Sequence, residues 1–294
     1  MKIGFIGLGV MGSAMCSNIL KKHESEVYVY DVAKEKMEYI AGKGGIACAS
    51  SAELVENSDV FITMVPRSQH VQMIFEEIKP KLRKGKIWIE MSTIDPDVSI
   101  EIGERVRDTG AEYADCPVVK SQPAAIAGKL GIFMGGEEEV FQTISPILKY
   151  MGENVIRMGK MGCGIIMKVC HNSLVHEIQN AVNETLTLAE LNGINVDLFA
   201  EAVSYGGGQN FYLESKKDAI RESDWTCAFP VEYAAKDLAI GQRLGRAHGL
   251  EMPGLNVALE TLNKAIEQGY GRLDNSASIL TVRNSVKKGG KYDS

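Results

Sequence analysis

The sequence predicts an α/β chain: an N-terminal doubly wound sheet followed by an all-α C-terminal domain, joined by a long interdomain helix. Two observations support this fold class. Over the first 160 residues, short β-branched runs alternate with amphipathic segments of helix length, which is typical of βαβ units in a largely parallel sheet. After Gly159 the alternation stops, and a proline-free stretch from Cys163 to about Leu191 is rich in helix formers. We therefore expect one domain over residues 1–160 and an all-helical domain over residues 161–294.

The individual elements follow from the same patterns. Seven runs are predicted to be strands: Lys2–Ile6, Val27–Tyr30, Val60–Val65, Ile87–Met91, Glu112–Cys116, Leu130–Met134 and Val155–Met158. Helices are expected at Lys34–Gly42 and Pro96–Thr109, and Ser51 stands in the position of an N-cap for a helix over Ala52–Asn57. Beyond the long helix no run has the pattern of a strand, and four segments have helical periodicity: Leu198–Ser204, Glu232–His248, Pro253–Gln268 and Ser276–Val282. The polar tail Lys287–Ser294 is expected to fray.

The composition is that of an ordinary globular protein and excludes several classes of function. The 294 residues are 45% hydrophobic and carry a net charge of −6, so the chain offers no basic footprint for nucleic acid or an anionic membrane. No apolar stretch approaches the ~20 residues that span a bilayer, and Met1–Ile6 leads into a glycine turn without the pattern of a signal peptide. The six cysteines are scattered, which favours reduced thiols and a cytoplasmic location. The short basic run Lys79–Lys86 is expected to be a solvated face.

A glycine-rich turn follows the first predicted strand directly and opens a helix. Its residues match the GxGxxG pattern and are Gly7, Leu8, Gly9, Val10, Met11 and Gly12. The first glycine allows a tight turn, the second lets the backbone approach a pyrophosphate, and the third lets the helix pack closely on the strand. The N-terminus of the helix then offers N–H groups to phosphates. In this context the motif predicts a Rossmann domain that binds a nicotinamide dinucleotide; the alternative is that the glycines only make a tight turn.

Residues at the ends of other predicted strands complete the cofactor site. Asp31 ends the second strand, where a carboxylate accepts hydrogen bonds from ribose hydroxyls and repels a 2′-phosphate. No arginine follows closely, so we predict NAD rather than NADP, against the alternative that Asp31 is an ordinary turn residue. Ligands of open α/β sheets bind outside the carboxyl ends of the strands. We therefore assign two strand ends to the nicotinamide half of the cofactor: Met64, Val65 and Pro66 after one strand, and Met91, Ser92 and Thr93 after the next. The alternative is that both are simple transitions from strand to loop.

Three polar residues share one face of the predicted long helix. Lys168, His171 and Asn172 stand at positions i, i+3 and i+4, among apolar neighbours such as Met167 and Val169. We expect burial and the positive nicotinamide ring of the oxidised cofactor to lower the pKa of Lys168 towards neutrality. A lysine of that kind suits proton exchange with a hydroxyl group. Taken alone, however, a helical lysine is more often a solvated side chain.

Motifs along nearly the whole chain together resemble those of the β-hydroxyacid dehydrogenases, the family that contains 3-hydroxyisobutyrate dehydrogenase and tartronate semialdehyde reductase. These motifs are the glycine turn, Asp115–Val118, Gly128–Leu130, Met134–Gly136, Gly162–Asn172 and Lys236–Leu238. The resemblance implies that Lys168 is the catalytic acid/base, that Asn172 orients the substrate, and that Lys236 lies close to the nicotinamide and the substrate. It also implies a homodimer or homotetramer formed through the helical domain.

Two segments depart from the common pattern of this family. His171 stands where an Asn-Asn pair is common, although Lys-x-x-His-Asn also occurs in the related 6-phosphogluconate dehydrogenases; it either hydrogen-bonds the substrate or structures the helix. Val119, Lys120 and Ser121 replace the Ser-Gly-Gly that holds the substrate carboxylate. This loop resembles the branch that includes sulfolactaldehyde reductase, and a basic residue there would suit a sulfonate. The alternative is that Lys120 points to solvent while Ser121 and backbone amides hold a plain carboxylate.

The sequence thus predicts an NAD-dependent dehydrogenase that reversibly oxidises a small anionic β-hydroxy acid, or reduces the matching semialdehyde. An imine reductase of the same fold and a non-catalytic NAD-binding protein are the alternatives; Lys168 argues against the first, because imine reductases usually replace that lysine. No cluster of Cys, His and Asp has metal-ligand spacing, so no metal is expected. The loop Gly206–Gly208 before Phe211 either lies near the substrate or is a plain connection.

Overall fold

The computed structural model describes residues 1–286, and the predicted tail Lys287–Ser294 lies outside the described residues. The chain divides into two compact units after Lys168. The first unit contains the sheet, and the described part of the second unit is helical. These units are defined by contacts within the chain, and the predicted domain boundary between residues 160 and 161 stays a prediction.

The first unit is built on one mixed sheet whose larger part is parallel. Its strands are β1 (Ile3–Ile6), β2 (Val27–Tyr30), β3 (Ile46–Ala47), β4 (Val60–Thr63), β5 (Ile87–Glu90), β6 (Glu112–Asp115), β7 (Val118–Val119), β8 (Leu130–Gly135) and β9 (Gly152–Gly159). The order β3-β2-β1-β4-β5-β6 is parallel throughout, which is the doubly wound arrangement with its switch point between β1 and β4. β8 then pairs antiparallel with β6 and β7 and parallel with β9.

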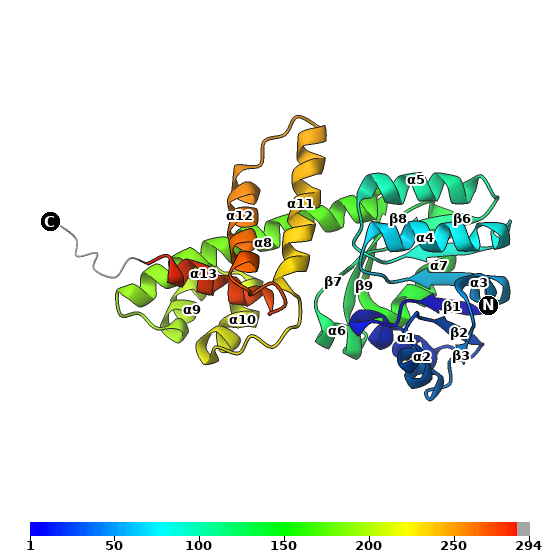
Figure 1. The fold of residues 1–294 in the computed structure, drawn as a ribbon, viewed down its shortest axis with the longest axis horizontal. Coiled ribbons are helices and arrows are strands. Elements are labelled where there is room, and N and C mark those ends of the chain that lie inside the picture. Colours follow the sequence, from blue (N-terminus) through cyan, green and yellow to red (C-terminus); the bar gives the residue numbers. More distant parts are fainter. Residues whose placement is uncertain (287–294) are drawn as a thin grey trace. The chain divides into compact units, whose positions relative to one another are not determined.

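Helices cover both faces of this sheet, as Figure 1 shows. They are α1 (Val10–Lys22), α2 (Lys34–Ala41), α3 (Ser51–Asn57), α4 (Ser68–Ile78), α5 (Pro96–Arg107), α6 (Gln122–Ala127) and α7 (Glu138–Met151), with a 3₁₀ turn η1 (Lys79–Lys81). Successive side chains of a strand point to opposite faces, so Phe5 packs in a core with α1 and α7, while Ile6 packs in a second core with α3, α4 and α5. The parallel strands are therefore held between two packed layers.

The predicted fold class is confirmed, and the differences in this unit are local. The N-cap of α3 is Ser50, whose side chain accepts a hydrogen bond from the Glu53 amide at 3.1 Å, so the assignment of this role to Ser51 was wrong. Ser51 is instead buried within the helix. Strands β3 and β7 were not predicted, because two residues are too few to show an alternating pattern.

The basic run between α4 and β5 is not a uniformly solvated face, which corrects the prediction for its last residue. Lys86 is buried, and its ammonium donates to the carbonyl oxygens of Val55 at 2.7 Å, Glu56 at 3.0 Å and Ser58. These carbonyls lie at the C-terminal end of α3, where a cation also complements the helix dipole. Burial lowers the pKa of Lys86. The sequence did not predict this contact, because it joins residues about thirty positions apart.

The second unit is a set of packed helices. The long helix α8 (Cys163–Leu191) begins in the first unit and has the predicted bounds; it is followed by α9 (Val196–Ser204), α10 (Phe211–Glu222), α11 (Val231–Ala247), α12 (Pro253–Glu267), the 3₁₀ turn η2 (Asn275–Ser278) and α13 (Ile279–Asn284). Helices α11 and α12 pack against each other (Figure 1) through an apolar core that includes Leu238, Leu255 and Leu262. Helix α10 was not predicted, because three glycines precede it closely and mask its start.

Two further expectations concern the whole chain. Within residues 1–286, none of the helices combines the length and the apolar character that crossing a bilayer requires. All six cysteines are free, and the reduced state of their thiols stays a prediction.

Candidate active site

The glycine turn between β1 and α1 has the close contacts that the GxGxxG motif predicts. Gly7 has a φ of +93°, a left-handed conformation that side chains disfavour, and a Cβ there would overlap the carbonyl oxygen of Met64. A Cβ on Gly12 would overlap the carbonyl oxygen of Gly7. Gly9 differs, because a Cβ at this position would meet nothing within 4 Å. The protein's own backbone therefore requires Gly7 and Gly12, whereas Gly9 leaves open space at the start of α1.

This open space fits the pyrophosphate of a dinucleotide. Gly9 is the N-cap of α1, no side chain caps the helix, and no acidic residue lies in its first turn. The N–H groups of Val10, Met11 and Gly12 are not used by the helix itself, since the first turn has no preceding carbonyls. Phosphate oxygens complement these donors and the positive end of the helix dipole. A side chain at Gly9 would fill the same space.

Asp31 joins the end of β2 to the glycine turn. Its buried carboxylate accepts a hydrogen bond from the Leu8 amide at 2.6 Å and one from the Ala33 amide at 2.9 Å. The ammonium of Lys36 lies 4.0 Å from the same carboxylate. Because each carboxylate oxygen can accept more than one hydrogen bond, these contacts fix Asp31 and still leave it acceptor sites for the hydroxyls of a ribose.

The other predicted cofactor residues follow the carboxyl ends of the two next parallel strands. Met64 and Val65 come directly after β4 and are half-buried, Pro66 is exposed, and Thr93 follows β5. The Val65 amide donates to the hydroxyl of Ser92 at 2.8 Å, which ties the two strand ends together. With the contact between Gly7 and Met64, the structure brings all the cofactor residues predicted in the first unit to one edge of the sheet.

The start of α8 is held by the end of β6. The carboxylate of Asp115 accepts hydrogen bonds from the amides of Gly162 and Ile165, both at 2.7 Å. A Cβ on Gly164 would press against the carbonyl oxygens of Phe133 and Asp115, so the helix approaches the sheet as closely as glycine allows. Burial raises the pKa of Asp115 to about 6, and the backbone donors oppose that rise. This cap fixes the first turn of the helix that carries Lys168.

The predicted polar face of α8 is largely buried. Lys168 is 8% exposed and Asn172 6%, while His171 is half-buried, with its Nδ1 3.2 Å from the side-chain oxygen of Asn172. The Asn172 amide donates to Asp237 of α11 at 2.6 Å. Lys236, which neighbours Asp237, forms an ion pair with the same carboxylate at 3.2 Å. One buried carboxylate in the second unit therefore holds both Asn172 and Lys236.

The predicted anion-binding segment has an unusual backbone. Val119 ends β7 and is buried, whereas Lys120 has a φ of +77°, in the left-handed region that glycine favours. The Lys120 ammonium donates to the carbonyl oxygen of Lys129 and to the carboxylate of Glu153, both at 2.9 Å. Ser121 is exposed and is the N-cap residue of α6, although its side chain makes no capping hydrogen bond.

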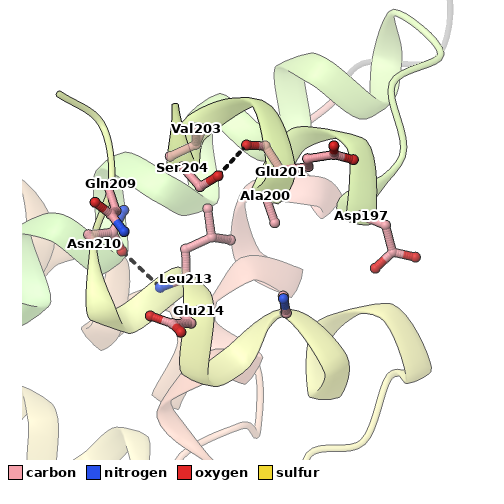
Figure 2. A pocket seen from close by; sticks show the side chains of 10 residues that line it. Asp197, Ala200, Glu201, Val203, Ser204, Gln209, Asn210, Leu213 and Glu214 are labelled. Carbon is pink, nitrogen blue, oxygen red and sulfur yellow. Dashed lines mark hydrogen bonds between the residues drawn. The ribbon is translucent and has the colours of Figure 1, made fainter. Parts of the chain in front are cut away.

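The glycine loop of the second unit lies beside a separate pocket. Gly206–Gly208 connects α9 to α10, and Asn210 caps α10 by accepting a hydrogen bond from the Leu213 amide at 2.8 Å. Gln209, Asn210 and Glu214 are among the residues that line a pocket of about 420 Å³ (Figure 2). None of the residues that we assign to substrate or cofactor lines this pocket. A role for the loop near the substrate therefore stays a prediction.

Some residues that organise the site were not predicted from the sequence. Glu90 hydrogen-bonds Ser92 of the predicted strand end, and Asp237 holds Asn172 and Lys236. In the sequence, Glu90 is marked only as a polar residue at the end of an apolar strand. Asp237 is marked only as the neighbour of Lys236. Among residues 1–286, no group of three or more His, Cys, Asp or Glu side chains is placed to hold a metal ion.

Comparisons with known proteins place the chain among nicotinamide-dependent oxidoreductases. Residues 2–159 match the family described as the NAD-binding domain of 6-phosphogluconate dehydrogenase, and residues 162–282 match the NAD-binding region of NADP-dependent 3-hydroxyisobutyrate dehydrogenase. A glyoxylate/succinic semialdehyde reductase of Arabidopsis thaliana is 30% identical, over 97% of this chain and 99% of the relative. An NAD-dependent L-serine dehydrogenase of Pseudomonas aeruginosa is also 30% identical, over 93% and 95%.

A solved structure extends the similarity to the whole fold. A 3-hydroxyisobutyrate dehydrogenase of Mycobacterium tuberculosis, described with L-serine, matches with a TM-score of 0.89 and 27% identity, covering 96% of this chain and 99% of its own. The two family matches together span nearly the whole chain, and the full-length relatives and this structure extend over the same range. The chain therefore belongs to the β-hydroxyacid dehydrogenase family of nicotinamide-dependent oxidoreductases.

Proposed function

We propose that this enzyme catalyses the NAD-dependent, reversible oxidation of a small β-hydroxy acid to the matching semialdehyde, with Lys168 as general acid/base. One observation carries the proposal. A buried lysine stands one helical turn from a buried asparagine, and that asparagine is held by Asp237. Long charged side chains on helices usually keep their ends in water, so a buried lysine beside a fixed amide suits proton transfer at a substrate hydroxyl.

Each residue of this face has a distinct role in the proposal. The bound nicotinamide dinucleotide supplies the hydride acceptor. Lys168 takes the proton of the substrate hydroxyl during oxidation and returns it during reduction. Asn172 uses one amide N–H on Asp237 and has a second N–H with which to orient the substrate. The contact between His171 and Asn172 supports a role for His171 in fixing that amide.

The anionic group of the substrate is assigned to Val119, Lys120 and Ser121. The partners of the Lys120 ammonium, Lys129 and Glu153, support a plain carboxylate held by Ser121 and backbone amides. A sulfonate would require Lys120 to leave Glu153. Such an exposed ion pair contributes about 0–1 kcal/mol, so its loss is a small obstacle and only a comparison of substrates decides between the two anions.

The preference for NAD rests on Asp31. Its fixed carboxylate would repel the 2′-phosphate of NADP, and the nearest cation, Lys36, is already drawn towards Asp31 itself. The name of the Pseudomonas aeruginosa relative, an NAD-dependent dehydrogenase, supports the same preference. We expect the enzyme to be a cytoplasmic homodimer or homotetramer, which light scattering on the purified protein would test.

The test is a panel of hydroxy acids oxidised with NAD or NADP, followed by the absorbance of the reduced cofactor. The panel contains 3-hydroxyisobutyrate, glycerate, L-serine, 2-(hydroxymethyl)glutarate and 2,3-dihydroxypropanesulfonate. We expect turnover of at least one carboxylate, with kcat/KM higher for NAD than for NADP. A sulfonate preference that Lys120→Ala abolishes would replace the carboxylate assignment. No turnover with any acid, and none of the matching semialdehydes with NADH, would contradict the proposed reaction.

A further inference from the structure

A row of buried polar residues lies across the carboxyl ends of three neighbouring strands. Thr63 of β4, Glu90 of β5 and Asp115 of β6 are paired in register, and none of them is more than 1% exposed. Asp115 caps α8, and the proposed mechanism gives Thr63 and Glu90 no role. Because a buried carboxyl group is costly unless it is well hydrogen-bonded, the contacts of Glu90 indicate what it does.

Glu90 holds both strand ends that are assigned to the nicotinamide half. Its Oε1 accepts a hydrogen bond from the Ser92 amide at 2.7 Å, and its Oε2 is hydrogen-bonded to the hydroxyl of Thr63. That hydroxyl also accepts from the indole N–H of Trp88 at 2.7 Å and donates its own proton to Glu90. The Ser92 hydroxyl in turn accepts from the Val65 amide at 2.8 Å. The Ser92 side chain also hydrogen-bonds Glu90, so Ser92 connects Glu90 to the backbone after β4 and after β5.

The direction of these hydrogen bonds matches an ionised carboxylate. Both oxygens of Glu90 act as acceptors, and a protonated acid would instead have to donate at one of them. Burial raises the pKa of Glu90 to about 7, so its protonation state changes near neutrality. The titratable groups that face it are Asp115, Tyr113 and Cys116, all on β6 or directly after it, and each is itself buried.

We propose that Glu90 is a positioning residue whose ionised form fixes the ends of β4 and β5 for the cofactor, so that its protonation weakens dinucleotide binding. Loss of the negative charge turns one acceptor into a donor and reorganises the Thr63 and Ser92 hydrogen bonds. The inference rests on the proposed function only in assigning Met64, Val65 and Thr93 to the nicotinamide half. It concerns cofactor binding and requires no turnover.

The test is the dissociation constant of NADH, measured by fluorescence titration of the full chain without substrate between pH 6 and pH 8.5. If only the ionised form binds well, the apparent constant scales inversely with the ionised fraction. For a pKa of about 7, the wild-type constant should rise roughly tenfold from pH 8 to pH 6. Glu90→Gln places an N–H donor where the acid would carry its proton, so this variant should bind at pH 8 at least as weakly as wild type does at pH 6.

Two control variants separate this role from a general loss of stability. Tyr113→Phe removes a phenol that faces Glu90 but keeps the acid and its acceptors, so its pH profile should follow that of wild type. Ser92→Ala cuts the link to Val65 while keeping Glu90 and serves if Glu90→Gln does not fold. It should bind NADH more weakly at pH 8, with a shallower pH dependence than wild type.

The NADH binding experiment and the substrate panel can fail independently of each other. If the NADH dissociation constant of Glu90→Gln changes with pH as it does in wild type, the proposed role of Glu90 is overturned. If Glu90→Gln does not fold, the same pH dependence in Ser92→Ala overturns it. Either result leaves the proposed dehydrogenase reaction untouched. A flat Glu90→Gln profile in a protein that oxidises none of the acids supports the role of Glu90 and contradicts the proposed reaction alone.

Discussion

The glycine turn and the Val119–Ser121 segment meet the same backbone requirement in two ways. Both contain a residue with a left-handed φ, +93° at Gly7 and +77° at Lys120, and both are assigned to an anion. At Gly7 the Met64 carbonyl leaves no room for a side chain. At Lys120 a long side chain is present and reaches Lys129 and Glu153. Gly7 and Gly12 of the first segment cannot accept a side chain without a shift of the backbone. The second segment accommodates lysine in a left-handed conformation, which costs about 1–2 kcal/mol in a non-glycine residue.

The largest effect is expected from breaking the glycine turn. Gly12→Ala places a methyl group against the carbonyl oxygen of Gly7, and neither atom can move without shifting the backbone. We expect a loss of about 4 kcal/mol or more in the free energy of unfolding, the range reserved for severe overpacking. Urea unfolding of the purified variant measures it.

Gly9→Ala is the matched control for that substitution. A Cβ at Gly9 meets nothing within 4 Å, so stability should stay within about 1 kcal/mol of wild type, while the affinity for NADH falls because the methyl group occupies the space for the pyrophosphate. A Gly9→Ala protein with unchanged NADH affinity would show that the open space is not the phosphate site. A Gly12→Ala protein as stable as wild type would show that the contact with Gly7 is misplaced.

The second effect concerns Glu90, the buried acid at the end of β5. The pKa of Glu90 is raised to about 7 in the folded protein, above the ordinary value of 4.5, so the folded state binds this proton more tightly than the unfolded state between those pH values. The free energy of unfolding should therefore fall as pH rises from about 4.5 to about 7, with a contribution from Glu90 of about 2–3 kcal/mol.

Urea unfolding at pH 5 and pH 8 tests this sign. Glu90→Gln cannot titrate, so the difference in stability between the two pH values should shrink by about that amount relative to wild type. Asp115, whose pKa is raised to about 6, adds a change of the same sign that remains in the variant. Equal pH dependence in wild type and variant would mean that Glu90 does not titrate in this range.

The smallest effect is expected at Lys120. Lys120→Gly should be more stable than Lys120→Ala by about 1 kcal/mol, because both lose the ion pair and only glycine relieves the left-handed strain. Glu104, which is exposed and lies inside helix α5, is the control position. There Glu104→Ala should be more stable than Glu104→Gly by about 1 kcal/mol, the opposite order to position 120. If alanine is also the more stable residue at position 120, the segment carries no strain.

Local features of the chain could be predicted from the sequence, and contacts between distant segments could not. The glycine turn was predictable because its requirements lie within a few residues of a strand and a helix, and the bounds of α8 followed from its composition. The burial of Lys86 and the hydrogen bonds of Glu90 were not predictable, because they depend on strands and helices that are distant in the chain. The left-handed φ of Lys120 had no signal either, since lysine ordinarily avoids that conformation.

The assignment of Lys168 to proton transfer is tested most directly by measuring turnover and NADH affinity side by side for Lys168→Ala, with the exposed Lys160→Ala as control. General acid/base catalysis contributes about 10²–10⁴ in rate. The account predicts that kcat/KM of Lys168→Ala falls by that factor while its NADH dissociation constant stays within about twofold of wild type, and that Lys160→Ala retains both. Turnover of Lys168→Ala within tenfold of wild type would contradict the account, because the proton would then be moved by another group.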